Sequence, residues 1–116
     1  MKHFDLPGGM RVEVVGESYY AAALSGLVDD GVKVTWASLV PEPTNPYDRN
    51  AVQVHINGIQ VGHLGREAAI AFMPVSKRIR ELGCEARCAA TIAGAHGVYG
   101  VVLELGTPDQ CLECLQ

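Results

Sequence analysis

Apolar and polar residues alternate in several short segments of the chain, and this period of two is typical of half-buried β-strands. The alternation is clearest over residues 10–16, 32–40, 51–56 and 59–64, and two further strand-like segments follow at 84–92 and 98–105. Short runs of glycine, asparagine or aspartate separate several of these segments. The pattern therefore predicts about six strands with mostly short connections.

Turn signals indicate how these strands pair. Asn57-Gly58 is a favoured two-residue hairpin turn because both positions accept a positive φ angle, and glycines at 94–97 indicate a second hairpin. Antiparallel strands around one core close most simply into a small barrel, which leaves no exposed strand edge. We expect a mainly β fold: one small antiparallel barrel with two or three short helices.

Helical spacing predicts the remaining elements. One short helix follows Ser18 and runs through an alanine-rich stretch to Leu27, and a longer helical pattern covers residues 65–82. Pro74 interrupts the longer pattern, so a kink or two consecutive helices are expected, the second beginning at Pro74. Gly83 is a plausible helix end. We predict one domain over residues 10–106 and a short, irregular and mobile tail over 107–116.

Composition and charge limit the classes of function. With 116 residues and 48% apolar content, the chain can form one core. Its apolar runs fall well short of the ~20 residues needed to cross a bilayer, and no secretory pattern is visible, so we expect a cytoplasmic protein without membrane contact. The net charge of −4 argues against broad coating of duplex DNA, so any nucleic-acid contact should be local.

The loop over residues 41–50 is the strongest candidate for binding. It carries three of the six prolines together with Asn45, Tyr47 and Asp48, so polar and aromatic groups are displayed on stiff backbone. A carboxylate beside an aromatic ring can accept a hydrogen bond from a sugar hydroxyl but repels a phosphate. The alternative for Asp48, an Asx turn onto Asn50, is equally compatible with the sequence.

The four tyrosines lie at strand ends or in loops, where rings can stack on bases of single-stranded nucleic acid. They are Tyr19, Tyr20, Tyr47 and Tyr99. The alternative is that each ring is half buried with its hydroxyl in water. His63 and Arg66 are one helical turn apart and could hold an anion at a helix start; alternatively, they bond to backbone and to a nearby acid.

The sequence offers little support for catalysis or metal chemistry. No common hydrolase, phosphate-loop, metalloprotease or dinucleotide motif is present, so we expect a non-enzyme without a cofactor. Cys111 and Cys114 have the spacing of a zinc knuckle. Hairpin register would place Cys84 opposite about Thr107, with Cys88 a further ~13 Å along the strand, which suits a four-sulfur site poorly. Buried thiols are favoured, with zinc binding as the alternative.

Several motifs together resemble the HIRAN domain family. They cover residues 14–20, 39–52, 61–64 and 66–68, and the run NPYDRNAV at 45–52 is the most specific. The resemblance implies a modified OB-like barrel with helical insertions that captures the free 3′ end of single-stranded DNA. It also implies site roles: stacking by Tyr47 and Tyr99, a 3′-hydroxyl contact by Asp48, a base-edge contact by Asn45, and phosphate contacts by Tyr19 or Tyr20 with His63 and Arg66. Ser18 stands where fork-remodelling members carry arginine, which removes one phosphate contact.

The sequence thus predicts a nucleic-acid-binding module for single-stranded DNA ends, linked to DNA repair or replication-fork processing. The resemblance implies that a helicase or another repair protein would act in trans. Three alternatives stay open: a general single-strand binder of DNA or RNA, a zinc- or thiol-dependent protein built on the cysteines, and a protein-interaction adaptor.

Overall fold

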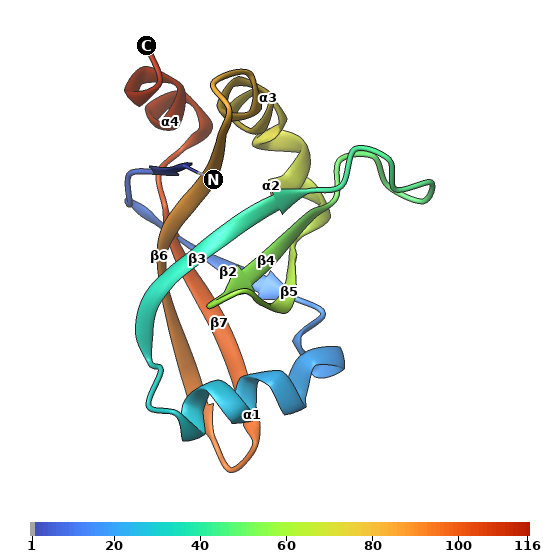
Figure 1. Ribbon diagram of the computed structural model, residues 1–116, viewed down its shortest axis with the longest axis vertical. Coiled ribbons are helices and arrows are strands. Elements are labelled where there is room, and N and C mark those ends of the chain that lie inside the picture. Colours follow the sequence, from blue (N-terminus) through green and yellow to red (C-terminus); the bar gives the residue numbers. More distant parts are fainter. Residues whose placement is uncertain (1) are drawn as a thin grey trace.

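Six antiparallel strands close into a barrel in the computed structural model, which describes residues 2–116 (Figure 1). They are β2 (Met10–Val15), β3 (Val34–Pro41), β4 (Val52–Ile56), β5 (Ile59–Leu64), β6 (Cys84–Ala95) and β7 (Val98–Leu105). Neighbouring strands follow the order β6-β3-β4-β5-β2-β7, and β6 pairs with β7 to close the ring. The predicted antiparallel barrel of six strands is confirmed.

A seventh strand, β1 (Lys2–Asp5), pairs in parallel with β6 and was not predicted. It takes the stretch of the β6 edge that β7 leaves free, because pairing of β6 with β7 ends at Ala89 opposite Glu104. Cys84 therefore lies opposite Lys2, and the expected position opposite Thr107 is wrong. An ion pair from β6 to β1 ties the two strands together, with Arg87 Nε 2.8 Å from Asp5 Oδ1.

Five short helical segments surround the barrel: η1 (Glu17–Tyr20), α1 (Ala21–Asp29), α2 (Arg66–Ala71), α3 (Met73–Glu81) and α4 (Pro108–Cys114). In Figure 1, α1 lies at one end of the barrel, while α3 and α4 lie at the other. The expected interruption is confirmed, but α3 begins at Met73, one residue before Pro74. Proline suits the first turn because its missing N–H would have no helical partner there.

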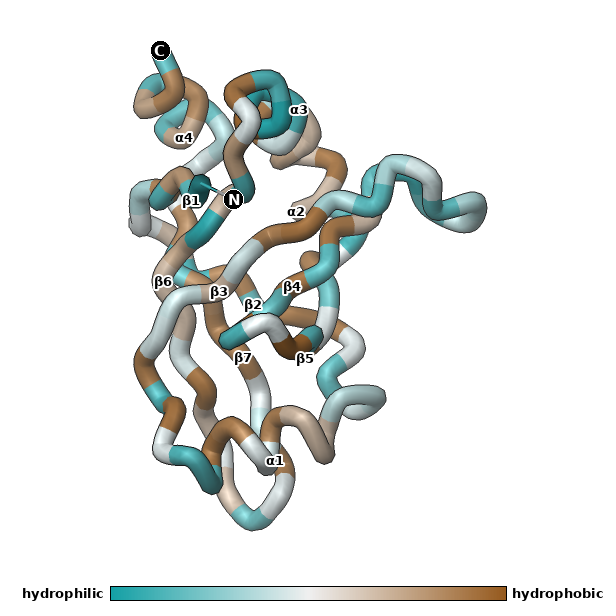
Figure 2. The backbone as a smooth tube through the Cα atoms, viewed as in Figure 1, coloured by the Kyte–Doolittle hydropathy of each residue, from teal (hydrophilic) through white to brown (hydrophobic). Residues whose placement is uncertain are grey.

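The core consists of apolar side chains from the six barrel strands that point into the barrel. Along β4, for example, Val52, Val54 and Ile56 are buried while the residues between them are partly exposed. Helix α1 adds Leu24 and Leu27 to this core, and α3 adds Val75 and Ile79. The loop between β3 and β4 extends away from the core and is largely hydrophilic (Figure 2).

The C-terminal segment departs from its expected irregular structure, because most of it forms α4. Thr107 and Gln110 make a reciprocal capping box: the Gln110 amide donates to Thr107 Oγ1 at 3.2 Å, and the Thr107 amide donates to Gln110 Oε1 at 2.9 Å. Such a Thr-x-x-Gln pattern is a sequence signal for a helix start. Cys111 and Leu115 are buried, so α4 is packed onto the domain.

All four cysteines are free thiols, and two of them belong to the core. Burial raises the pKa of Cys88 to about 12 and that of Cys111 to about 11, so both are neutral thiols near pH 7. Cys84 is partly buried and Cys114 is exposed. Within residues 2–116, no group of three or more histidine, cysteine or acidic side chains has an arrangement that could hold a metal ion.

None of the helices in residues 2–116 has both the length and the apolar character needed to span a membrane.

Candidate nucleic-acid interface

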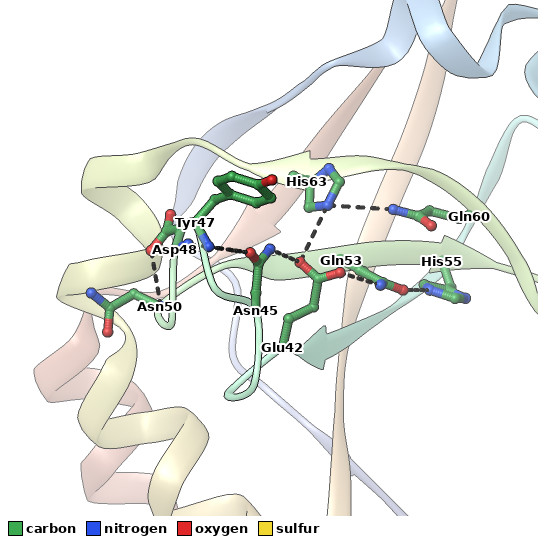
Figure 3. Close-up of polar contacts among 9 residues, drawn as sticks. All are labelled: Glu42, Asn45, Tyr47, Asp48, Asn50, Gln53, His55, Gln60 and His63. Atoms are coloured by element: carbon green, nitrogen blue, oxygen red, sulfur yellow. Dashed lines mark hydrogen bonds and ion pairs between the residues drawn. The ribbon is translucent and has the colours of Figure 1, made fainter.

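The loop between β3 and β4 is held in shape by its own polar side chains (Figure 3). Asn45 Oδ1 accepts hydrogen bonds from the backbone amides of Tyr47 at 2.9 Å and Asp48 at 3.2 Å. Asp48 Oδ1 in turn accepts the amide of Asn50 at 2.9 Å. The Asx turn of Asp48 onto Asn50, one of the two sequence alternatives, is therefore present. These bonds fix the direction in which Tyr47 and Asp48 are displayed.

Glu42 joins the loop to the barrel and lies at the centre of the polar network in Figure 3. Its Oε2 accepts a hydrogen bond from Asn45 Nδ2 at 3.2 Å and lies 3.6 Å from His63 Nε2 on β5. Its Oε1 accepts a hydrogen bond from Gln53 Nε2 on β4. One half-buried carboxylate thus connects the loop with two strands, and it leaves the loop little freedom to move.

The network extends along the outer face of β4 and β5. Gln53 Oε1 lies 2.7 Å from His55 Nε2, and Gln60 Nε2 lies 3.5 Å from His63 Nε2. The sequence did not indicate that Glu42, Gln53, His55 and Gln60 support the loop. Their alternation with buried β4 residues was a signal that they face outward, but not that they meet Glu42.

Acid should weaken this network, because hydrogen bonds from Gln53 hold the pKa of Glu42 below its ordinary value of 4.5, with Asn45 and His63 contributing in the same direction. A lowered folded-state pKa stabilises the fold above about pH 4.5, and that contribution is lost as the pH falls through the folded value. We predict that Glu42→Gln lowers the unfolding free energy by roughly 1 kcal/mol at pH 7, with a smaller difference at pH 3. Urea titrations of wild type and Glu42→Gln at pH 7 and pH 3 measure the difference in unfolding free energy. An equal difference at the two pH values would contradict the prediction.

Tyr47 and Asp48 present free groups to solvent. The Tyr47 side chain is 94% exposed, although its backbone is held on both sides by the turn. Asp48 Oδ2 accepts no hydrogen bond from residues 2–116, while Oδ1 is used within the loop (Figure 3). An aromatic ring and a carboxylate oxygen on adjacent residues of the loop are therefore not used by the fold. Asn45, in contrast, uses both its oxygen and its nitrogen within the loop, so its base-edge role stays a prediction.

His63 lies near the end of β5, and Arg66 begins α2. His63 Nε2 faces Glu42, which connects it with the loop. Arg66 is exposed and makes no ion pair with residues 2–116. The structure thus connects Asn45 of the loop with His63 of β5 through Glu42, and Tyr47 and Asp48 lie on the same loop.

Tyr19 and Tyr20 belong to η1, which packs against β5. Val15 at the end of β2 pairs with His63, so η1 begins close to the His63 end of β5. Glu17 Oε2 accepts the Val101 amide at 2.6 Å and ties η1 to β7. The Tyr19 side chain is 89% exposed and Tyr20 is half buried, so Tyr19 is the more accessible of the two.

Tyr99 is placed apart from Tyr47. It pairs with Gly94 near the β6–β7 hairpin, which lies at the end of the barrel away from the β3–β4 loop (Figure 1). It is half buried against the core and shares an open hollow of about 540 Å³ with Glu17 of η1. The structure therefore groups Tyr99 with η1, and the predicted joint stacking with Tyr47 gains no support from this placement.

The fold defines a small β-barrel domain whose candidate binding residues lie on the β3–β4 loop and on nearby strand ends. A family model described as the HIRAN domain matches residues 7–96. Since that match covers most of the chain, the protein belongs to the HIRAN domain family.

Individual relatives agree with this assignment. The helicase-like transcription factor of Mus musculus is 45% identical over 73 residues, which is 60% of this chain and 7% of that protein. The chain thus matches only a small part of that much longer relative. A crystal structure of the HIRAN domain of human HLTF has 25% sequence identity and a TM-score of 0.50, and the match covers 91% of this chain and 88% of that one. An NMR structure of the HLTF HIRAN domain in its DNA-bound conformation has 25% identity and a TM-score of 0.45, with 89% and 79% covered.

Proposed function

We propose that this domain binds nucleic acid, and that it captures the free 3′-hydroxyl end of single-stranded DNA without catalysing a reaction. The carrying observation is the exposed Tyr47 ring next to the free Oδ2 of Asp48, on a loop that Asn45 and Glu42 hold rigid. Membership of the HIRAN family supports the nucleic-acid part of the proposal. A partner with helicase activity would act on the DNA in trans, in repair or fork processing.

The chemistry of Tyr47 and Asp48 explains why the domain would prefer the 3′ end of a strand to an internal position. A base can stack on the Tyr47 ring, and such stacking contributes ~1–3 kcal/mol per base. The Asp48 carboxylate accepts a hydrogen bond from a terminal hydroxyl but repels a phosphate at the same position. An internal nucleotide carries a phosphate there, so only the terminal one satisfies both groups. His63 and Arg66 would balance the charge of the preceding phosphates.

End specificity is tested by fluorescence anisotropy with two oligonucleotides of one sequence, both labelled at the 5′ end, one with a 3′-hydroxyl and one with a 3′-phosphate. We expect the hydroxyl form to bind at least about tenfold more tightly, corresponding to ~1.4 kcal/mol. Asp48→Asn should reduce the difference in affinity between the two oligonucleotides, because the side-chain amide does not repel the 3′-phosphate. Equal affinities for wild type would refute end capture, and absence of binding to both would refute nucleic-acid binding.

A further inference from the structure

A second recess lies between the β3–β4 loop and α3, on the side of the loop where Arg49 and Asn50 are found. It consists of two adjoining hollows of about 20 and 210 Å³, which have Pro41, Ser76 and Arg80 in common. The two hollows are neighbours because three residues line both of them, and we call the pair the Arg49–Arg80 groove. Asn50 lies on the helix side of the network in Figure 3, away from His63.

The charges of this groove are unusual for the domain. Arg49 and Arg80 are both exposed, and neither makes an ion pair with residues 2–116. Arg78, in contrast, lies 3.4 Å from Glu81. The acid that lines the groove, Glu85, is at its far end and lies 3.5 Å from His3. Two free guanidinium groups therefore line the loop end of the groove, in a protein whose net charge is −4.

The walls between these cations are apolar or small. Pro41, Pro43 and Met73 line the narrow part, and Ser76 adds one hydroxyl. Guanidinium groups bind phosphate oxygens through paired N–H donors, and the larger hollow of about 210 Å³, which Leu39, Val40 and Ile79 also line, is wide enough to take the apolar face of a sugar ring. A sugar–phosphate backbone combines these two features, whereas a free inorganic anion would use the arginines alone.

The loop end of the groove and the Tyr47–Asp48 pair share the β3–β4 loop. Arg49 follows Asp48 directly, and the Asn50 amide that lies at the groove donates to Asp48 Oδ1 at 2.9 Å. We propose that Arg49 and Arg80 bind the sugar–phosphate backbone of the DNA whose end occupies the Tyr47–Asp48 pair. This inference rests on the proposed function, and it adds a second contact region on the other side of the loop.

The test compares Arg49→Gln/Arg80→Gln with wild type by anisotropy, using the 3′-hydroxyl oligonucleotide at several salt concentrations. The double variant should bind roughly ten- to a hundredfold more weakly, and the slope of log affinity against log salt should fall by ~1.4, about 0.7 per lost phosphate contact. Its preference for 3′-hydroxyl over 3′-phosphate should persist, because the end pair is intact. Unchanged melting temperatures confirm that the exposed substitutions leave the fold intact.

Lys77→Gln/Arg78→Gln is the matched control. It also removes two positive charges from the domain, both of them on α3, but these side chains line a hollow against α4 with Leu112 and Leu115. Its affinity should stay within about threefold of wild type, since screened charges away from the ligand contribute little. If both double variants lose affinity for the oligonucleotide equally, the groove is not a specific DNA contact. The loss would then reflect only the reduced positive charge of the domain.

Two outcomes separate the proposals. If wild type does not bind either oligonucleotide, the proposed function fails. If wild type binds with end preference and Arg49→Gln/Arg80→Gln matches it in affinity and salt slope, the groove inference fails alone. A polyglutamate peptide serves as the competing probe: loss of its binding in that variant, with DNA binding intact, would assign the groove to acidic protein partners and overturn the inference.

Discussion

Replacement of Gly62 by alanine is expected to remove much of the stability of the domain. A Cβ at this buried position on β5 would overlap the Val14 side chain and lie 2.6 Å from the Val15 carbonyl oxygen. The second neighbour is backbone of the paired strand β2, so it cannot rotate away, and the local φ of 155° is rarely adopted by L residues. This steric overlap can be relieved only if β2 and β5 move apart. We therefore expect Gly62→Ala to lower the unfolding free energy by roughly 3–5 kcal/mol.

Urea denaturation followed by circular dichroism measures this loss against a total of ~5–15 kcal/mol for a typical domain. Gly26→Ala is the matched control, because Gly26 lies within α1 and a Cβ there meets nothing within 4 Å. That change should stabilise the domain by ~0.5–1 kcal/mol through helix propensity. Similar midpoints for Gly62→Ala and wild type would contradict the role of Gly62 in the close approach of the two strands.

Local chemistry explains the features that could be predicted from sequence. Asn57 and Gly58 have φ angles of 52° and 78°, as the hairpin turn requires, and β5 has the expected bounds. Gly83 follows the end of α3 with a φ of 71°, which agrees with its predicted role as a helix end. Each of these signals involves a few neighbouring residues and a backbone conformation that few residue types adopt, so it can be recognised without the rest of the chain.

Non-local pairing explains the features that could not be predicted. The parallel contact of β1 with β6 joins Lys2 to Cys84, and no turn or periodicity connects segments so far apart. The position of Tyr99 depends on the register of β6 with β7 and on the packing of η1. The start of α4 is a different case, because its capping box is local: Thr107 and Gln110 have the spacing of a helix start, although we expected an irregular tail there.

The candidate site was predictable in its residues but not in its supports. The loop motif indicated Tyr47 and Asp48, since polar and aromatic groups on a proline-rich loop suit a ligand. That Glu42 connects this loop to Gln53 and His63 depends on strand register, which includes an irregularity between Val54 and His55. A preorganised loop loses less conformational entropy when a ligand binds, so these supporting contacts contribute to affinity without touching the ligand.

Tyr47→Ala should weaken binding of the 3′-hydroxyl oligonucleotide by about 5- to 150-fold, corresponding to the ~1–3 kcal/mol that a base gains on an aromatic ring. The domain itself should be unaffected, because the side chain is 94% exposed and the loop is held by the Tyr47 backbone amide rather than by its ring. Anisotropy measures the affinity, and thermal unfolding measures the stability.

Tyr47→Phe is the control that separates stacking from hydroxyl chemistry. It keeps the ring, so its affinity should stay within about threefold of wild type if stacking is the main contribution. A loss as large as that of Tyr47→Ala would instead assign the contribution to the phenolic hydroxyl. If Tyr47→Ala binds as tightly as wild type, the Tyr47 ring takes no part in binding. The proposal that a terminal base stacks on this ring would then be refuted.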